Sequence, residues 1–452
     1  MANFNFSSEN NFKDQSNEIL SSRRIIEDGK LIILMDTIEE TMNNCIETEN
    51  VIDGIYFIDK LLEVSPYNSD FWFKKGILLN IDLKFEEAIN CFDKAIFLNP
   101  GDVEIYLEKS ISEDGLCLTE CAIESLEKVL EMEPENDEAF YNLGLIFFRG
   151  NNIVRAKECF LKTLLLNDDN NEIYFDLASC EETLNEYNSA LIFIDKYLKT
   201  NPYNESAWYN KAVYLSALNR KEEALDSLEF ALAINGEFPQ AWFNKAVITA
   251  ELGQLHLAIE YFKNSLLYDP KDENSYMNLA NVYRELNNYE NAIKYYSKTL
   301  KINFENEKAY LGRADCYSIL GKYNFALRDY NKLLKFSFSN KEALFGKAEI
   351  EYSLGRLNFA CLTYDKILKI DPNDFNANLQ LSQIHFELGN YSEAINSFDK
   401  CVKLDNNNYL PYYYLAKIYK IKGNIVKVKE FVNLAVKYSP GNKKRIRNEF
   451  SC

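Results

Sequence analysis

Glycine and proline are scarce in this chain, with 16 and 9 residues among 452. Their scarcity argues against collagen-like chains, linker-rich chains and all-β folds with many turns. No segment approaches the run of about 20 apolar residues that a membrane-spanning helix needs. Residues 1 to about 20 are polar and lack the apolar core of a secretion signal. These absences predict a long helical protein without membrane insertion, preceded by a disordered tail over residues 1–20.

Basic residues are outnumbered by acidic ones, 50 against 69, so the formal net charge is −19. Nucleic-acid binding depends on basic patches that neutralise phosphates, and binding to anionic membranes depends on similar patches. The composition therefore disfavours both and favours protein partners. Because no export signal accompanies the ten cysteines, we expect reduced thiols and a cytoplasmic location.

Residue patterns of enzymes are missing as well. The chain contains neither a glycine-rich phosphate-binding motif nor HExxH. Its two histidines, His256 and His385, occupy ordinary positions of the repeat described below. Cys117 and Cys121 are four residues apart, but a structural zinc site normally requires four ligands. We therefore expect no catalytic residue, no metal site and no cofactor.

Proline spacing reveals an internal repeat. Seven of the nine prolines are separated by 34 residues or by multiples of 34, from Pro66 to Pro440. Proline cannot continue a helix, so each one marks the end of a unit. Counting in steps of 34 from Ser69 keeps one register through Asn442, which makes eleven repeats over residues 69–442.

Each repeat has the pattern of two helices joined by a tight turn. Position 8 is always small, from Gly76 to Ala416, and position 20 is Ala in every repeat except the last, which has Val428. Two small residues facing each other allow close helix packing. Position 4 is usually aromatic and position 24 is usually a large apolar residue. Position 15 is mostly Asn or Gly, the residues that best accept the left-handed conformation after a helix.

These residues resemble the tetratricopeptide repeat, with Trp or Tyr at position 4, Gly or Ala at 8, Ala at 20, Phe or Tyr at 24 and Pro at 32. The resemblance implies an all-α, right-handed superhelical solenoid of antiparallel helix pairs, of the long bacterial type. Residues 35–68 match the repeat only in their second half, so we expect degenerate capping helices or a half repeat over residues 21–68. The first helix of repeat 103–136 is polar and contains Gly115, so this repeat departs from the pattern of the family. Residues 443–452 are expected to be a basic tail.

The same resemblance implies that first helices line a concave groove, where positions 2, 5, 6, 9, 12 and 13 contact ligands. Position 5 is apolar and mostly aromatic, and position 9 is mostly apolar in the first six repeats before it turns polar. The predicted peptide-binding residues are Phe73, Ile77, Tyr141, Asn142, Leu145, Phe175, Asp176, Tyr209, Asn210, Val213, Phe243, Asn244, Val247 and Asn278.

Two interpretations of the position-6 amides stay open. An amide offers a donor and an acceptor, which suits an extended peptide backbone, and similar ladders hold peptides in some long family members. Asn at position 6 is also a common consensus residue of the repeat. Binding of acidic chaperone tails, which uses a basic clamp in the family, is disfavoured because position 2 carries Asp70, Glu104, Glu138 and Glu172.

Function is therefore expected to be non-catalytic: a scaffold or adaptor that holds an extended segment of a partner protein in the groove. The alternative is self-association. Residues 443–452 look too short for a closing helix, which would leave Val426, Val428, Phe431 and Val432 exposed for a homodimer contact. A polar outer face of the last repeat would remove the reason for that contact.

Overall fold

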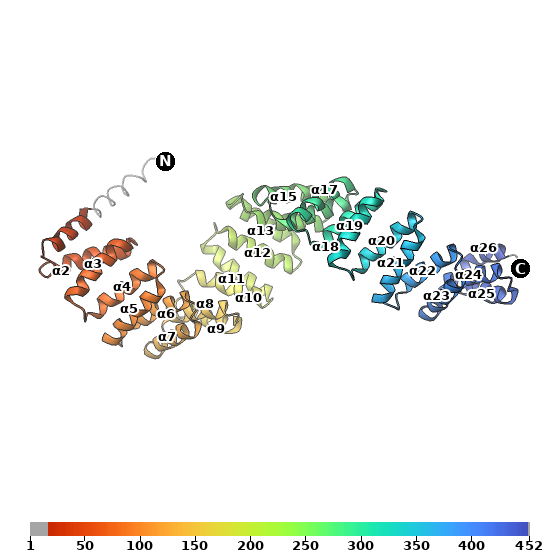
Figure 1. Cartoon of the computed structure of the whole chain (residues 1–452). Helices are drawn as coiled ribbons and strands as arrows, with labels where there is room; N and C mark the ends of the chain where they lie inside the picture. The colour runs from red at the N-terminus through yellow and green to blue at the C-terminus, as the bar shows by residue number, and fades with distance from the viewer. Residues whose placement is uncertain (1–16, 451–452) are drawn as a thin grey trace. The chain divides into compact units, whose positions relative to one another are not determined.

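The computed structural model describes residues 17–450, and this part of the chain is helical, with no strand. The chain divides into two compact units, residues 1–227 and 228–452. Each unit is a succession of helix pairs, and each helix packs on its neighbours along the chain (Figure 1). The predicted all-α repeat fold is confirmed.

Helices of the first unit follow the predicted register, with first helices at positions 1–13 and second helices at positions 17–30. They are α2 (Met35–Glu47), α3 (Val51–Val64), α4 (Ser69–Ile81), α5 (Phe85–Leu98), α6 (Val103–Gly115), α7 (Thr119–Met132), α8 (Asp137–Arg149), α9 (Ile153–Leu166), α10 (Glu172–Thr183), α11 (Tyr187–Thr200), α12 (Glu205–Ala217) and the start of α13 (Lys221–Ile234).

The second unit continues in the same register from the end of α13. Its helices are α14 (Pro239–Glu251), α15 (Leu255–Tyr268), α16 (Glu273–Glu285), α17 (Tyr289–Ile302), α18 (Glu307–Ile319), α19 (Tyr323–Phe336), α20 (Lys341–Ser353), α21 (Leu357–Ile370), α22 (Phe375–Glu387), α23 (Tyr391–Leu404), α24 (Tyr409–Ile421), α25 (Ile425–Tyr438), the 3-10 turn η1 (Pro440–Asn442) and α26 (Lys443–Phe450).

Local residues set the ends of the first helices. In most repeats, Asn or Asp at position 34 of the preceding repeat accepts a hydrogen bond from a backbone N–H of the first turn, as Asn136 does from Ala139 at 2.8 Å; Asp102 and Phe238 form no such bond. Such a cap satisfies a donor that has no partner within the helix. Past the helix end, position 15 has positive φ, as predicted for Asn151 and Gly253. Leu83 and Cys117 adopt the same conformation, although neither residue type favours it.

The helix pair of each repeat is held together by its small residues. Ala88 and Ala156, both at position 20, are fully buried. At position 8, a Cβ added to Gly144 would lie 2.5 Å from Phe160 Cε1, and Phe160 at position 24 is itself buried. The ring therefore occupies the space that a side chain at position 8 would need.

The N-terminal part is more regular than predicted. Residues 35–68 form a complete pair, α2 and α3, rather than half a repeat. Residues 17–27 are also helical: the buried Ser22 hydroxyl hydrogen-bonds Thr41 at 2.8 Å, and Arg23 pairs with Asp53 at 2.5 Å. The prediction of a disordered tail over residues 1–20 is therefore wrong for residues 17–20, and residues 1–16 lie outside the described part of the chain.

Repeat 103–136 has normal helix geometry despite its polar first helix. Gly115 is the last residue of α6 and does not interrupt it. The buried Glu113 carboxylate accepts a hydrogen bond from Ser125 at 2.7 Å, and the Ser110 hydroxyl donates to the Leu107 carbonyl at 2.6 Å. Polar side chains are tolerated in this core because their hydrogen bonds are made inside it.

Residues 443–450 form helix α26, not the expected tail. Ile446 and Phe450 are buried against the last repeat, and Glu449 accepts from the Tyr413 hydroxyl at 2.6 Å and pairs with Lys417 at 3.0 Å. Val428 is buried and Phe431 and Val432 are half-buried, while Val426 is 79% exposed. Eight residues suffice for this cover because two apolar side chains four apart share one helix face.

Gly144→Ala tests the close approach at position 8. We expect the variant to lose about 1–3 kcal/mol of stability, because its Cβ meets the buried Phe160 ring. Gly101→Ala is the control, since an added Cβ at Gly101 meets nothing within 4 Å. Urea denaturation followed by circular dichroism measures both. An unchanged midpoint for Gly144→Ala would contradict the packing argument.

Candidate functional site

First helices of successive repeats contact one another partly through positions that were predicted to contact a ligand. In the first unit, Asn80 Nδ2 donates to Glu108 Oε2 at 3.2 Å, and the Tyr214 hydroxyl donates to Glu182 Oε2 at 3.0 Å. These contacts join positions 12 and 6 and positions 10 and 12 of neighbouring repeats. We call the side chains at positions 2, 5, 6, 9, 12 and 13 the first-helix face of a unit.

The predicted apolar residues of the first unit lie on this face and are half-buried. Three position-5 rings pack on rings of the second helix of their own repeats. Phe73 packs on Phe92 with centroids 6.1 Å apart, and Tyr141 packs on Phe160 with centroids 5.8 Å apart. Phe175 packs on Tyr197 at 5.3 Å. These rings therefore have a packing role and keep part of their surface on the face.

The rest of the apolar stripe in the first unit differs in exposure. Ile77, Leu145, Tyr209 and Val213 are half-buried. Ile111 at position 9, which was not among the predicted binding residues, is 41% exposed. Ile111 is therefore the most accessible of the apolar position-9 residues named here, ahead of Ile77, Leu145 and Val213.

Position 6 does not present a uniform ladder of amides. The Nδ2 atom of Asn142 is enclosed and has no acceptor among the described residues. Asn278 Nδ2 donates to the Asn274 carbonyl of its own helix at 2.9 Å. The Tyr141 hydroxyl of the preceding repeat interacts with Asp176 and acts to lower its pKa, whereas Asn210 and Asn244 are half-buried. The peptide-backbone role of these amides stays a prediction.

Burial changes the acidity of two position-6 carboxyls. It raises the pKa of Asp176 to about 6, with a further contribution from Glu172, although the Tyr141 hydroxyl acts in the opposite direction. Burial also raises the pKa of Glu108; the Asn80 hydrogen bond opposes this shift, and Glu138 and Glu104 add to it. Both charges therefore lie where water screens them poorly and where no cation compensates them.

The first-helix face of the second unit changes character along the chain. Phe243 packs on Phe262 with centroids 5.8 Å apart, and Val247 joins the same core cluster. In the next two repeats, position 24 is tyrosine and its hydroxyl donates to position 9: Tyr296 to Asn281 and Tyr330 to Asp315, both at 2.7 Å. The polar residues at position 9 therefore serve buried hydroxyls.

Glycine at position 6 accompanies these tyrosines. A Cβ added to Gly312 would lie 2.5 Å from Tyr296 Cζ, and one added to Gly346 would lie 2.5 Å from Tyr330 Cζ. Sequence reasoning treated positions 24, 9 and 6 separately and missed their coupling. The sequence carried this signal in two successive repeats, where Tyr at 24, a polar residue at 9 and Gly at 6 of the next repeat occur together, but Tyr364 is followed by Gln380.

A pocket of about 600 Å³ hollows the first-helix face of the second unit. Its walls combine apolar side chains with carboxylates and lie mostly at the positions expected to contact ligands. The lining residues are Leu311, Asp315, Ser318, Ile319, Tyr330, Glu342, Phe345, Gly346 and Glu349.

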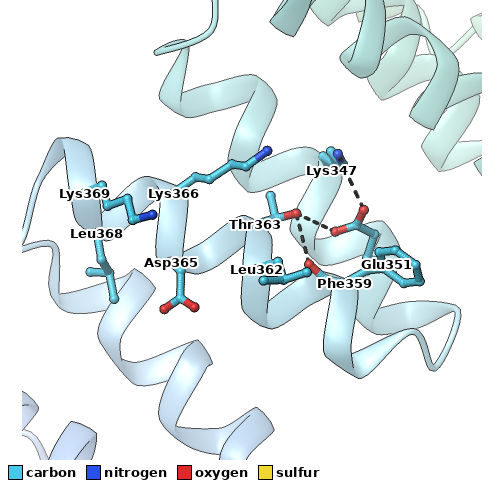
Figure 2. Close-up of a pocket in the computed structure, with 9 residues that line it drawn as sticks. All are labelled: Lys347, Glu351, Phe359, Leu362, Thr363, Asp365, Lys366, Leu368 and Lys369. Carbon is cyan, nitrogen blue, oxygen red and sulfur yellow. Dashed lines mark hydrogen bonds and ion pairs between the residues drawn. The ribbon is translucent and has the colours of Figure 1, made fainter.

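Position 7 carries a second interaction that sequence reasoning missed. Its lysines pair with the position-25 acid of the preceding repeat, as in Lys75–Asp59 at 2.6 Å and Lys211–Asp195 at 2.7 Å. The residue at position 25 of the repeat before Lys347 is Asn331 instead of an acid, and Lys347 Nζ lies 3.7 Å from the Glu351 carboxylate. It lines a pocket of about 510 Å³ with Glu351, which accepts from Thr363 at 2.7 Å (Figure 2). This pocket therefore lies beside the position-7 lysine that has no acid at position 25 of the preceding repeat.

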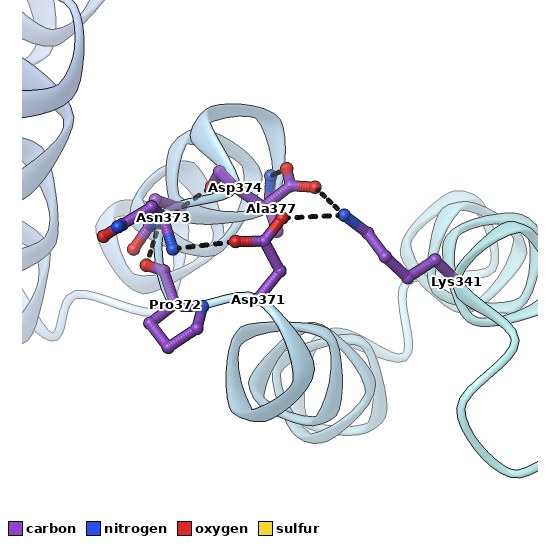
Figure 3. A network of polar contacts seen from close by, with 7 residues as sticks. Lys341, Asp371, Pro372, Asn373, Asp374 and Ala377 are labelled. Atoms are coloured by element: carbon purple, nitrogen blue, oxygen red, sulfur yellow. Dashed lines mark hydrogen bonds and ion pairs between the residues drawn. The ribbon is translucent and has the colours of Figure 1, made fainter.

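Lys341, at the start of its repeat, forms ion pairs with two acidic residues at the end of the same repeat (Figure 3). Its Nζ lies 3.0 Å from Asp371 and 2.8 Å from Asp374. Asp374 also caps α22 by accepting from the Ala377 N–H at 2.9 Å. The network links the start of the first helix with the loop that ends the repeat, so its role is structural.

Nothing in residues 17–450 assembles a metal-binding group of three or more His, Cys, Asp and Glu side chains. His385 Nδ1 is buried without a partner in this part of the chain, and His256 is exposed. Burial raises the pKa of Cys45, Cys316 and Cys401 to about 11, which makes these thiols poor nucleophiles.

Among the helices described, none is long and apolar enough to cross a membrane.

Comparison with protein families matches repeat units along the chain. Models of the tetratricopeptide repeat match residues 120–158, 209–273, 274–306 and 363–396, and a model of the TPR repeat matches residues 383–423. A model of the protein prenyltransferase alpha subunit repeat matches residues 187–218.

Individual relatives are distant. The TPR repeat-containing protein MJ1428 of Methanocaldococcus jannaschii is 23% identical over 166 residues, which cover 33% of this chain and 28% of the relative. The C-terminal part of a TPR repeat-containing protein from Cytophaga hutchinsonii is 20% identical, with a TM-score of 0.49, and covers 52% of this chain and 97% of its own. YrrB, described as a TPR protein with an unusual peptide-binding site, is 22% identical, with a TM-score of 0.37 and coverage of 41% and 96%.

Asp176→Asn tests the electrostatic state of the first-helix face. Because the pKa of Asp176 is raised to about 6 in the folded chain, its ionisation costs stability as the pH rises from about 4 through 6. We expect the variant to be more stable than the wild type by about 1–2 kcal/mol at pH 8, and equally stable below about pH 4. Unfolding in urea at several pH values measures this difference, with the exposed Asp168→Asn as control. A difference that does not change with pH would refute the assignment.

Proposed function

The chain belongs to the tetratricopeptide repeat family, and on this basis we propose that it is a non-catalytic scaffold that holds an extended segment of a partner protein on its first-helix face. The predicted binding residues of each unit lie on that face, half-buried and partly accessible. The observation that carries the proposal is the exposed Ile111 side chain, which lies on the same face as the half-buried position-9 residues Ile77 and Leu145.

An extended segment suits this face for a geometric reason. Position 9 recurs once per repeat, so its apolar side chains form a row of separate contacts and not one deep cavity. A chain without its own fold can place side chains along such a row. Half-buried rings such as Phe73 and Phe175 are held by their packing on second helices, so binding would order few additional side chains.

Self-association through the C-terminal end has less support. Helix α26 buries Ile446 and Phe450 against the last repeat. Val426, at 79% exposed, and Ile425, at 64%, remain accessible, which is a small apolar surface for a stable dimer. No specific observation favours this second function.

Ile111→Ser tests the proposed binding face. Peptides that bind the full-length chain are first selected from a displayed random library, and their affinities are then measured by fluorescence anisotropy. We expect Ile111→Ser to weaken them about tenfold, because an apolar contact is lost from the centre of the face.

Leu161→Ser is the matched control. Leu161 is also 41% exposed, but it lies on the second helix α9. We expect no change in affinity for this variant. Loss of binding in Leu161→Ser with retention in Ile111→Ser would refute the assignment to the first-helix face.

A further inference from the structure

Charge is distributed unequally between the two units. Residues 1–227 contain 44 acidic and 20 basic residues, whereas residues 228–452 contain 25 acidic and 30 basic residues. The first unit thus has a net charge of −24 and the second of +5. The net acidity of the whole chain comes from the unit that carries Ile111.

Acidic side chains are concentrated on the first-helix face of the first unit. Counted from repeat 69–102 onward, its basic side chains among the described residues are Lys74 and Arg149. The acidic side chains at the same set of positions are Asp70, Glu104, Glu108, Asp114, Glu138, Glu172, Asp176 and Glu182.

Both basic side chains are already engaged. Lys74 Nζ lies 2.7 Å from Asp70 and 3.2 Å from Glu39, and Arg149 pairs with Asp114. The other six carboxylates form no ion pair within residues 17–450. The face therefore carries uncompensated negative charge along its apolar row.

Helix dipoles explain only part of this pattern. Glu104, Glu138 and Glu172 lie in first turns, where negative charge is favoured. Glu182 lies in the last turn of α10, where negative charge is disfavoured. Glu108 lies in the middle of its helix, and burial raises its pKa. Local helix stability therefore does not account for Glu182 or Glu108.

We propose that the partner segment bound by the first unit is basic, with Lys or Arg side chains that pair with these carboxylates while apolar residues between them contact Ile77, Ile111 and Leu145. The proposal rests on the proposed function, and charge complementarity selects the occupant. An acidic or neutral segment would leave the carboxylates near Glu108 without a counter-ion beneath a bound chain, and such desolvated charges are costly.

The test uses three labelled peptides of equal length that share the same Leu and Phe residues. Lys and Arg stand between these residues in the first peptide, Gln in the second and Glu in the third. Anisotropy titrations with the full-length chain should show the basic peptide binding at least about tenfold more tightly than the Gln peptide, with an affinity that falls as salt rises. Equal affinities for the basic and Gln peptides would overturn the inference.

Two triple variants locate the charge. Glu104→Gln, Glu138→Gln and Glu172→Gln together remove three exposed first-turn charges of first helices. Glu86→Gln, Glu120→Gln and Glu222→Gln remove three exposed first-turn charges of second helices. The two variants therefore lose the same number of charges, in the first turn of a helix, and differ in whether that helix is the first or the second of its repeat. We expect about tenfold weaker binding of the basic peptide in the first variant and less than about twofold in the second. Equal weakening would mean unspecific attraction and would overturn the inference.

Failure of this inference is distinguishable from failure of the proposed function. If Ile111→Ser weakens the peptides selected from the library but those peptides are acidic or neutral, the first-helix face is the binding site and the basic segment is wrong. If Ile111→Ser changes none of them, the proposed function fails. Concentration-dependent self-association in sedimentation, lost in the first triple variant, would assign the face to a second copy of the chain and would also overturn the inference.

Discussion

Close approach of the two helices in each repeat is the constraint on which the structure depends. Position 20 is a buried alanine in nearly every repeat, position 8 is small, and a side chain at position 24 fills the space between them, as Phe160 does against Gly144. Small residues permit this spacing, and the spacing aligns positions 5 and 9 as a row on the first helices. The row of potential contacts is thus a consequence of packing inside the repeat.

Position 24 also links the core to the surface. Beside Phe92, the residue at position 9 is the apolar Ile77, whereas the repeat of Phe398 has Gln383 there. Where position 24 is tyrosine, a buried hydroxyl needs an acceptor, and Asn281 or Asp315 supplies it. In these two repeats, the hydroxyl of a core tyrosine therefore accounts for the polar residue at position 9.

Sequence reasoning succeeded where one residue has the same local role in every repeat. The helix–turn–helix unit, the left-handed residue at position 15 and the small residues at positions 8 and 20 were of this kind. It failed at the two ends of the array, where α26 and the pair of α2 and α3 depart from the consensus. It also missed the pairing of Lys75 with Asp59, because partners sixteen residues apart are recognised only once the packing of neighbouring repeats is known.

The sequence by itself determined the 34-residue register, the helix pair and the row of apolar residues, because these depend on caps, turns and periodicity within one repeat. Only the tertiary structure decided which polar groups are satisfied. Arg149 and Lys74 lie against carboxylates, whereas Glu108 and Asp176 have no cation. That difference depends on distances between repeats and on burial, which determine the strength of each charge interaction and have no signature in local pattern.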